Sequence, residues 1–228
     1  MQDRVAFFDI DGTVFRSSLL IELVEELIKR GIFPPEARDF YDEQKQNWQD
    51  REGSYEDYID AVVDSFRHHL KGVFYGDLAD VGREVVAVQS KHVYRYTRDL
   101  IKELKRDGYY LVAISQSPKT ILNDFCQQYG FDKVYGRLYE IGPQDRFTGV
   151  VSEEHLIANK ANIVARVFAE TGFEQKASIG VGDTEGDITL LESVDRPICF
   201  NPNQALYEHA KRRGWPIVVE RKDVIYEL

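Results

Sequence analysis

Short apolar runs and helix-like spacings alternate along most of this chain. Residues 5–8 form a continuous apolar run, which predicts a strand buried on both faces of a parallel sheet. From residue 94 onward strand patterns are separated by helical patterns, which predicts right-handed βαβ units. We expect strands at 110–114, 134–141, 147–153, 178–181, 197–200 and 216–219, the second and third as a hairpin, and helices at 94–107, 118–129, 159–171, 187–193 and 203–213.

Residues 17–87 differ, because they show helical spacing without a strand signal. The expected helices begin at an N-cap of Ser17 or Ser18, at Pro34-Pro35, and near residues 55 and 76. We predict an α/β fold: a Rossmann-like three-layer core with a parallel sheet, made of residues 1–16 and 88–228, and a helical cap domain, residues 17–87, inserted after strand one. The insert then lies above the carboxyl end of that strand, where open α/β sheets bind ligands.

The composition excludes several classes of function. The chain has 228 residues, a formal net charge of −10 and 43% hydrophobic residues, enough for a sizeable core. Its average field repels polyanions, so we expect no nucleic acid and no membrane as a partner, and a phosphate site needs local cations. We find no signal-peptide pattern and no apolar run long enough to span a membrane. We therefore expect a cytoplasmic protein in which Cys126 and Cys199 are buried free thiols.

Two carboxylates follow the first strand. Asp9 and Asp11 gather at its carboxyl end, and Gly12 permits a tight turn behind them. Two close carboxylates repel each other unless a cation or a proton lies between them. Taken alone, the pair is more typical of a turn with solvated acids than of a functional site.

Two further positions suit a phosphoryl group. The strand at 110–114 delivers Ser115 before Gln116, Ser117 and a helix, and a hydroxyl beside free N–H groups is an anion site. Simple helix capping by either serine is the alternative. Lys160 begins a helix, where a cation opposes the helix dipole by about 0.3–1 kcal/mol, and this indicates an anion or an acidic cluster opposite it. The alternative is a surface lysine.

A second acidic turn follows the strand at 178–181. Asp183 lies at the mouth of this strand, and Asp187 follows within the same turn. A parallel sheet gathers all these strand ends on one edge, where carboxylates suit a hard divalent cation. No His/Cys cluster suggests zinc, and no Walker loop suggests a nucleoside triphosphate.

Together these motifs resemble the haloacid dehalogenase superfamily of phosphohydrolases. Residues 7–14, Phe-Phe-Asp-Ile-Asp-Gly-Thr-Val, resemble its first motif, Ser115 its second, Lys160 its third, and residues 182–187, Gly-Asp-Thr-Glu-Gly-Asp, its fourth. All four occur in order along residues 5–200. The helical insert, of the C1 type, and residues 114–118, 129–132 and 147–149 are similar to the branch that contains phosphoserine phosphatase.

The resemblance implies a Mg²⁺-dependent phosphatase that acts on a small phosphorylated metabolite. Asp9 is then a nucleophile that becomes an aspartyl phosphate, and Asp11 is the general acid and base. It implies that Mg²⁺ binds Asp9, the backbone carbonyl of Asp11, Asp183 and waters. Asp187 is then a further ligand or orients metal-bound waters.

The same resemblance implies a binding site for the phosphoryl oxygens. Ser115, the N–H of Gln116 and Lys160 supply its donors, and Lys160 also offsets the charge of the nucleophile. Hydrolysis of a phosphate monoester can require an acceleration of about 10²¹, so that no single group suffices.

The insert is expected to choose the substrate. Phosphoserine enzymes of this branch carry a Glu after the first motif and an Arg in the cap; here Ser17 or Ser18 stands near the first place, and Arg67 is the substitute for the second. Gln116 and Ser117 also stand where those enzymes have glycines. Phosphoserine is therefore an alternative substrate, beside histidinol phosphate and phosphocholine-like or phospholipid-head esters. An aromatic set forms either a wall for a cationic substrate or packing between helices: Tyr41, Trp48, Tyr55 and Tyr58.

Two other functions are open alternatives. A phosphotransferase would pass the same aspartyl phosphate to an alcohol instead of water. A catalytically silent binding module is a third reading, since fold does not fix function, although Asp9, Asp11, Lys160 and Asp183 are all present. We expect a monomer or a homodimer.

Overall fold

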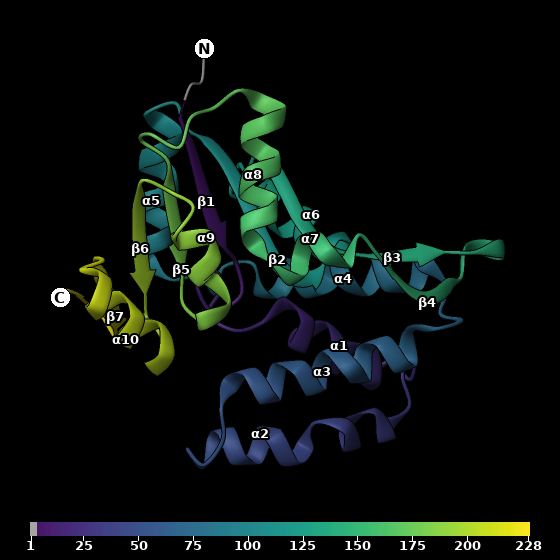
Figure 1. The fold of residues 1–228 in the computed structure, drawn as a ribbon. Coiled ribbons are helices and arrows are strands. Elements are labelled where there is room, and N and C mark those ends of the chain that lie inside the picture. The colour runs from purple at the N-terminus through teal and green to yellow at the C-terminus, as the bar shows by residue number, and fades with distance from the viewer. Residues whose placement is uncertain (1–3) are drawn as a thin grey trace.

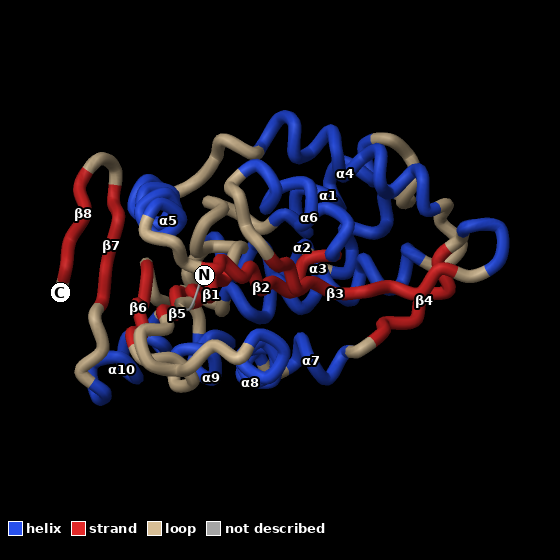
Figure 2. Tube along the Cα trace, turned by 90° about the horizontal axis from the view of Figure 1, so that it is seen from above, coloured by secondary structure: helices blue, strands red, loops and turns tan. Residues whose placement is uncertain are grey.

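The computed structural model describes residues 4–228, which form an eight-stranded sheet with helices on both faces (Figures 1 and 2). The strand order is β4-β3-β2-β1-β5-β6-β7-β8, parallel except for the outer pairs β3–β4 and β7–β8. This arrangement confirms the predicted α/β class and the predicted hairpin. The strands are β1 Val5–Asp9, β2 Tyr110–Pro118, β3 Lys133–Ile141, β4 Phe147–Ser152, β5 Ile179–Gly182, β6 Arg196–Phe200, β7 Ile217–Arg221 and β8 Val224–Glu227.

The helices divide between the two faces and the insert. Figure 2 shows α5 and α6 on one side of the sheet and α7 to α10 on the other. The core helices are α5 Arg95–Arg106, α6 Lys119–Gln128, α7 Glu154–Ala158, α8 Lys160–Thr171, α9 Ile188–Leu191 and α10 Gln204–Arg213, with short 3₁₀ turns η2 Pro143–Asp145 and η3 Glu185–Asp187. The insert contains α1 Leu19–Lys29, η1 Pro35–Phe40, α2 Asp42–Gln49, α3 Tyr55–Leu70 and α4 Tyr75–Gln89.

Strand β1 lies at the centre of the sheet because both of its faces are apolar. Phe7 packs into the cluster beneath α8 to α10, and Phe8 packs into the cluster on the opposite face. Both side chains are fully buried, as expected for a parallel strand covered by helices on each side. The central strand therefore ends inside the molecule, and the residues that follow it lie at the carboxyl ends of the parallel strands.

The inserted helices share one hydrophobic cluster with the Phe8 face of the sheet. Leu20 of α1 and Phe66 of α3 belong to this cluster, together with Ala6 and Phe8 of β1. Helix α4 packs against both α1 and α6, so it joins the insert to the core. Figure 1 shows α1, α2 and α3 lying beyond the carboxyl end of β1. The insert therefore covers the strand ends that carry the acidic motifs.

Several predicted elements have different bounds in the structure. The second inserted helix breaks at Tyr41, whose ring is buried while its hydroxyl donates to Glu25 Oε1 at 2.9 Å. Strand β2 continues to Pro118 instead of stopping at Ile114, so the helix after Ser115 starts later than expected. The chain also forms β8 after a turn at Lys222, which lacks the usual turn glycine and gave no sequence signal.

Two other expectations concern side chains and membranes. Cys126 and Cys199 are buried free thiols, as predicted. None of the helices within residues 4–228 is long and apolar enough to cross a lipid bilayer.

The central position of β1 predicts a large stability cost for a core truncation. We expect Phe8→Ala to lower the free energy of unfolding by about 3–5 kcal/mol, because the Phe8 ring is fully buried and packs edge-on against Phe131 with the ring centroids 5.8 Å apart. Val88→Ala is the control, since Val88 is 73% exposed, and should change it by less than about 0.5 kcal/mol. Urea denaturation measures both, and equal effects would contradict the assigned core.

Candidate active site

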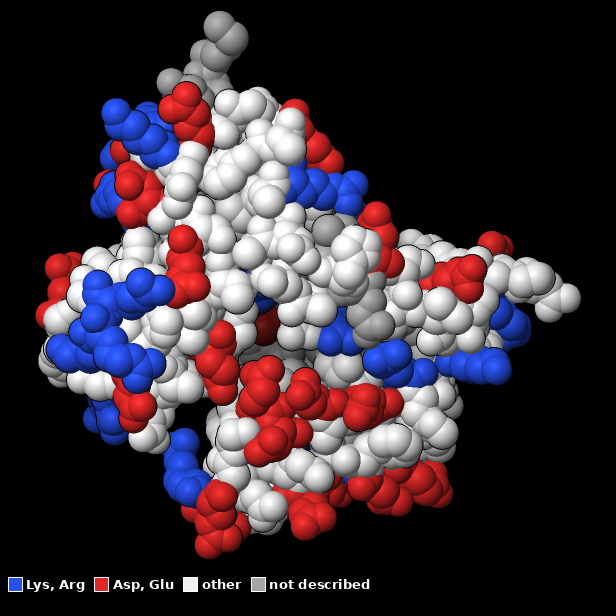
Figure 3. All heavy atoms as spheres, viewed as in Figure 1, with Lys and Arg blue, Asp and Glu red and all other residues white. Residues whose placement is uncertain are grey.

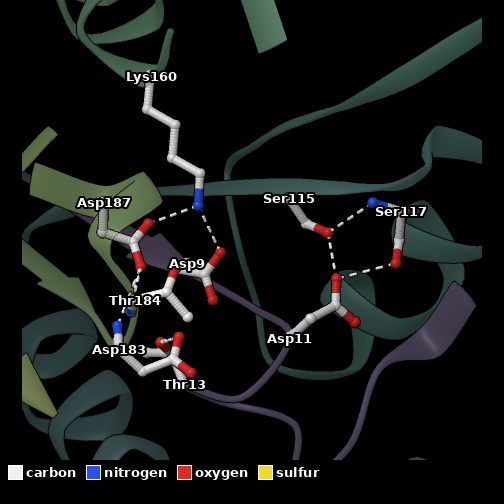
Figure 4. A network of polar contacts seen from close by, with 9 residues as sticks. All are labelled: Asp9, Asp11, Thr13, Ser115, Ser117, Lys160, Asp183, Thr184 and Asp187. Atoms are coloured by element: carbon white, nitrogen blue, oxygen red, sulfur yellow. Dashed lines mark hydrogen bonds and ion pairs between the residues drawn. The ribbon is translucent and has the colours of Figure 1, made fainter. Parts of the chain in front are cut away.

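The carboxyl ends of three neighbouring strands and the start of α8 meet at one place. Asp9 ends β1, Ser115 lies near the end of β2, and Asp183 follows β5, while β1 pairs in parallel with both β2 and β5. Figure 4 shows Lys160 reaching toward this point from α8, with Asp187 beside it. Motifs that are far apart in the sequence therefore form one polar cluster.

Lys160 lies between two carboxylates at the centre of the cluster. Its Nζ donates to Asp9 Oδ1 at 2.6 Å and to Asp187 Oδ1 at 2.5 Å. The exposed fractions of Lys160, Asp9 and Asp187 are 6%, 5% and 0%, so these charges have left bulk water. Asn159 fixes the position of the lysine by capping α8, since its Oδ1 accepts from the N–H of Ala161 at 3.0 Å.

Burial and the neighbouring opposite charges shift the pKa values of Asp9 and Lys160 in opposite directions. Burial raises the pKa of Asp9 to about 7, although the Lys160 charge lowers it. Burial lowers the pKa of Lys160, but Asp187 and Asp9 together raise it by more than burial lowers it. The lysine pKa therefore lies above its ordinary value. The ammonium group is thus charged, and it is the main stabiliser of the ionised Asp9.

Asp187 has both carboxylate oxygens engaged. Besides Oδ1 on Lys160, its Oδ2 accepts from the N–H groups of Asp183 and Thr184 at 3.0 and 3.1 Å. Thr184 and Asp187 form a capping box at the start of η3. The turn after β5 therefore uses Asp187 to set its own backbone and to orient Lys160.

Asp183 is placed by the turn that follows β1. The hydroxyl of Thr13 donates to Asp183 Oδ1 at 2.8 Å. Gly12 has φ +87°, and a Cβ atom there would overlap the Asp183 carboxylate. Burial, and then the charges of Asp9 and Asp187, raise the pKa of Asp183 well above its ordinary value. The two acidic turns therefore fit against each other directly.

Asp11 faces the insert and the serines of β2. Its Oδ1 accepts from the N–H of Leu19 at 2.6 Å, and its Oδ2 accepts from the hydroxyls of Ser115 and Ser117, the latter at 2.8 Å. Asp11, and not Ser18, supplies the side-chain cap of α1, because Ser18 occupies the N-cap position without a side-chain hydrogen bond. Burial raises the pKa of Asp11, and the hydrogen bonds from Ser115 oppose this shift.

The serines of β2 do not cap α6, which begins at Lys119 after Pro118. The N–H of Ser117 donates to Ser115 Oγ at 2.8 Å, while Ser117 Oγ accepts from the N–H of Leu20 at 3.1 Å. Ser117 thus connects the first turn of α1 to the strand end. Hydrogen bonding to the insert and to Asp11 replaces the capping role that the sequence had left open.

A cavity between the insert and the core opens onto this cluster. Its lining includes residues from both parts: Asp9, Asp11, Ser18, Leu20, Tyr55, Glu56, Ile59, Asp60, Val63, Gln116, Ser117, Lys160, Asp183, Thr184 and Gly186. A larger hollow of about 940 Å³ lies by β6 and β7, but its lining contains none of the motif residues. The chemistry therefore points to the smaller cavity.

The residues proposed for substrate contact fall in different places. Ser18 lines the cavity, whereas Ser17 donates to Glu22 Oε1 at 3.1 Å and lines a neighbouring hollow. Arg67 lies farther along α3, and the structure does not bring it into the described lining of the cavity. Gln116 lines the cavity and accepts through Oε1 from the guanidinium of Arg137 on β3.

The aromatic set divides between packing and lining. Tyr41 and Tyr58 are buried with their ring centroids 6.1 Å apart, so they pack the helices together. Trp48 stacks on Tyr58 at 5.9 Å. Only Tyr55 of this set is among the described residues that line the cavity.

Sequence reasoning missed the acidic wall formed by Glu56 and Asp60, and it missed Arg137. A signal existed for the acids, since residues 56 and 60 share one face of a helix at i and i+4. It could not show that this face meets the strand ends. Arg137 gave no signal, because hairpin register decides which side chains reach inward.

The acidic cluster fits a hard divalent cation. Asp9, Asp183 and Asp187 each offer an oxygen, and these atoms lie within 4.8 Å of one another. Asp9 Oδ2 is buried without a hydrogen-bond donor among the described residues, so the Asp9 carboxylate has lone pairs left for a ligand. Carboxylate oxygens are the ligands that such cations prefer. Because Asp187 is already engaged through both oxygens, Asp9 and Asp183 are the candidates for direct contact.

The acidic cluster lies at the strand ends of an α/β fold, and the sequence matches a family of hydrolases over most of its length. The family model of haloacid dehalogenase-like hydrolases matches residues 6–192. The chain belongs to this family, and it is a hydrolase of the phosphatase type.

Individual relatives resemble the chain in sequence or in fold. The chain is similar to a histidinol-phosphatase of Neisseria meningitidis, with 27% identity over 227 residues that cover 94% of this chain and 98% of the relative. Among solved structures, a Bordetella pertussis Tohama I protein of unknown function aligns with a TM-score of 0.75 and 21% identity, covering 95% of this chain and 98% of that one. A phospho-aspartyl intermediate analogue of phosphoserine phosphatase aligns with a TM-score of 0.64 and 19% identity, covering 98% and 96%.

The buried lysine predicts a strong energetic coupling within the cluster. We expect Lys160→Met to lower the free energy of unfolding by about 3–5 kcal/mol, because it leaves Asp9 and Asp187 buried without their cation. In a double-mutant cycle with Asp187→Asn, the coupling energy should exceed about 1 kcal/mol. Lys102→Met is the control, since the Lys102 side chain is 70% exposed. Equal effects at the two lysines would contradict the assigned role of Lys160.

Proposed function

We propose that this phosphatase is a Mg²⁺-dependent phosphomonoester hydrolase that acts through an aspartyl phosphate on Asp9. The observation that best supports this proposal is the environment of the Asp9 carboxylate. Its Oδ1 is held by Lys160, while its Oδ2 is buried at the cavity without a donor among the described residues. An oriented, desolvated oxygen with free lone pairs is what an attack on phosphorus requires.

In the proposed first step, Asp9 Oδ2 forms a bond to phosphorus as the bond to the leaving oxygen breaks. Asp11 donates a proton to that oxygen, so that the product leaves as an alcohol. In the second step, Asp11 removes a proton from a water that attacks phosphorus, and the bond to Asp9 breaks. Phosphate leaves, and both carboxyl groups return to their starting states.

Ser115 and Asp11 change partners in this scheme. A serine hydroxyl has one proton to donate, and that of Ser115 is given to Asp11 in the structure. When Ser115 donates to a phosphoryl oxygen instead, it releases Asp11 on that side. Binding of the phosphoryl group thus frees the carboxyl group to turn toward the leaving oxygen.

The other proposed contacts follow from the cluster. Lys160 and the N–H of Gln116 hold phosphoryl oxygens together with Ser115. Asp9 through Oδ1, Asp183 and the carbonyl of Asp11 are the proposed ligands for Mg²⁺, which leaves Asp9 Oδ2 for the attack on phosphorus, and Asp187 positions the lysine. The ion, when bound, neutralises charge on the phosphoryl oxygens.

We further propose that residues 17–87 act as a cap that covers the cavity and chooses a small phosphorylated metabolite. Histidinol phosphate is the favoured candidate, because the Neisseria meningitidis histidinol-phosphatase matches this chain over nearly its whole length. Phosphoserine is the second candidate, favoured by the fold similarity to a phosphoserine phosphatase.

The nucleophile is tested by a substitution that keeps its shape. Asp9→Asn should lower the release of phosphate from p-nitrophenyl phosphate by at least about 10³-fold, because an amide does not form the covalent intermediate. Phosphate release with Mg²⁺, and after excess EDTA, is measured on folded protein verified by circular dichroism. Turnover that survives either Asp9→Asn or EDTA would refute the mechanism.

The two roles of Asp11 can be separated by the choice of leaving group. p-Nitrophenolate leaves without protonation, so Asp11→Asn should still phosphorylate Asp9 while failing to activate water. We expect a burst of nitrophenolate close to one per enzyme in rapid-quench experiments, followed by slow turnover. Asp9→Asn should give no burst. Wild-type steady-state turnover in Asp11→Asn would contradict this assignment.

A further inference from the structure

The wall of the cavity opposite Asp9 is acidic. Tyr55, Glu56 and Asp60 lie in the first half of α3 and line the cavity, with Glu56 half-buried and Asp60 exposed at its mouth. Glu56 and Asp60 are at positions i and i+4, so they share one face of the helix. Figure 3 shows acidic side chains gathered on the surface over α3, below a hollow between α3 and the core.

The described residues supply no ion-pair partner for these two acids. Lys160 is engaged by Asp9 and Asp187, and the side chain of Arg137, whose charge acts on Asp60, donates to Gln116. No lysine, arginine or histidine within residues 4–228 forms an ion pair with Glu56 or Asp60. Like charges at i and i+4 destabilise a helix, so the pair lacks a structural reason.

Charge and burial make this wall unfavourable in the absence of a ligand. Burial, and then the charge of Asp60, raise the pKa of Glu56. Burial also raises the pKa of Asp60, although Arg137 opposes the shift. A cation bound between the two carboxylates would relieve both effects.

The unpartnered Asp9 oxygen sets how a substrate lies in the cavity. Asp9 is only 5% exposed and lines the same cavity, and its Oδ2 is buried without a hydrogen-bond partner among the described residues. When phosphorus lies at this atom, the rest of the ester extends toward the opposite wall. The alcohol part of the substrate therefore meets Tyr55, Glu56 and Asp60.

We propose that the substrate is a phosphomonoester whose alcohol carries a positive charge and no carboxylate, recognised by Glu56 and Asp60 with the ring of Tyr55 beside them. This inference rests on the proposed function and deepens it. The carboxylates attract an ammonium or imidazolium group, and an aromatic ring adds a cation–π contact. The same acids repel a carboxylate, which gives discrimination as well as attraction.

This chemistry separates the two candidate substrates. Histidinol phosphate carries an amine and an imidazole but no carboxylate. Phosphoserine carries a carboxylate beside its amine, and that group would meet the acidic wall. The wall therefore favours the first candidate.

The test compares three esters of similar size that differ in charge: 2-aminoethyl phosphate, 2-hydroxyethyl phosphate and phosphoglycolate. Each is measured as a competitive inhibitor of p-nitrophenyl phosphate hydrolysis, so that a value results whether or not the ester is itself hydrolysed. We expect the inhibition constant to rise from the cationic to the neutral to the anionic ester, by at least about tenfold overall. Histidinol phosphate should likewise bind more tightly than phosphoserine.

Matched variants test whether Glu56 and Asp60 cause the preference for the cationic ester. Glu56→Gln and Asp60→Asn should each reduce the ratio of inhibition constants between the anionic and cationic esters, and the double variant should bring it to within about threefold. Asp64→Asn is the control, because Asp64 lies one turn farther along α3, is exposed and is not in the described lining of this cavity, although it borders a neighbouring hollow together with Asp60. It changes the net charge equally and should keep the wild-type ratio.

The outcomes separate this inference from the proposed function. If the wild type hydrolyses p-nitrophenyl phosphate but shows no preference for the cationic ester, the inference fails and the mechanism stands. A preference that Asp64→Asn reduces as much as Glu56→Gln and Asp60→Asn also overturns it. If the wild type hydrolyses no phosphomonoester, the proposed function fails and the inference fails with it.

Discussion

The site depends on one buried ammonium group placed between two carboxylates. Lys160 lies between Asp9 and Asp187, and all three side chains are almost fully buried. Charges taken out of water are costly unless their geometry and hydrogen bonds compensate for the lost hydration. Each element that brings a partner therefore supports the others: β1 delivers Asp9, α8 delivers Lys160, and η3 delivers Asp187.

Asp11 extends this network into the insert. Its carboxylate binds the first N–H of α1 and the hydroxyls of Ser115 and Ser117, while Ser117 also binds the N–H of Leu20. The start of α1 is therefore attached to the residue proposed as general acid and base. A shift of α1 relative to the sheet would change the partners of Asp11 directly. In this way the position of the insert and the readiness of the acid are connected by hydrogen bonds.

The sequence predicted the residues at the strand ends better than it predicted the residues that form the cavity wall opposite them. Asp9 and Asp183 follow short apolar runs, and a parallel sheet places such positions together without further information. Glu56 and Asp60 required knowledge of how α3 docks, which depends on many apolar contacts such as those of Phe66. The spacing of α3 shows that these acids share a face. The same sequence pattern, however, is expected whether a polar helix face meets solvent or a cavity. Likewise the break at Tyr41 depends on its hydroxyl reaching Glu25, a long-range contact invisible in local spacing.

The balance of charge in the cavity constrains its ligands. Four motif carboxylates, those of Asp9, Asp11, Asp183 and Asp187, surround one ammonium group. Burial raises the pKa values of Asp9 and Asp183, and the neighbouring carboxylates add to this shift. A phosphate ester adds further negative charge, and at short range each uncompensated pair costs several kcal/mol at an effective dielectric constant of about 20. A divalent cation bound as proposed by Asp9 and Asp183 would offset this repulsion at the floor of the cavity. Such an ion would leave Glu56 and Asp60 at the opposite wall without an ion-pair partner, although the charge of Arg137 acts on Asp60. Under the proposed recognition, a substrate that brings its own positive charge to that wall completes the balance, whereas one that brings a carboxylate worsens it. We infer that this asymmetry would give a selectivity for the alcohol part that contacts to the phosphoryl group alone do not supply.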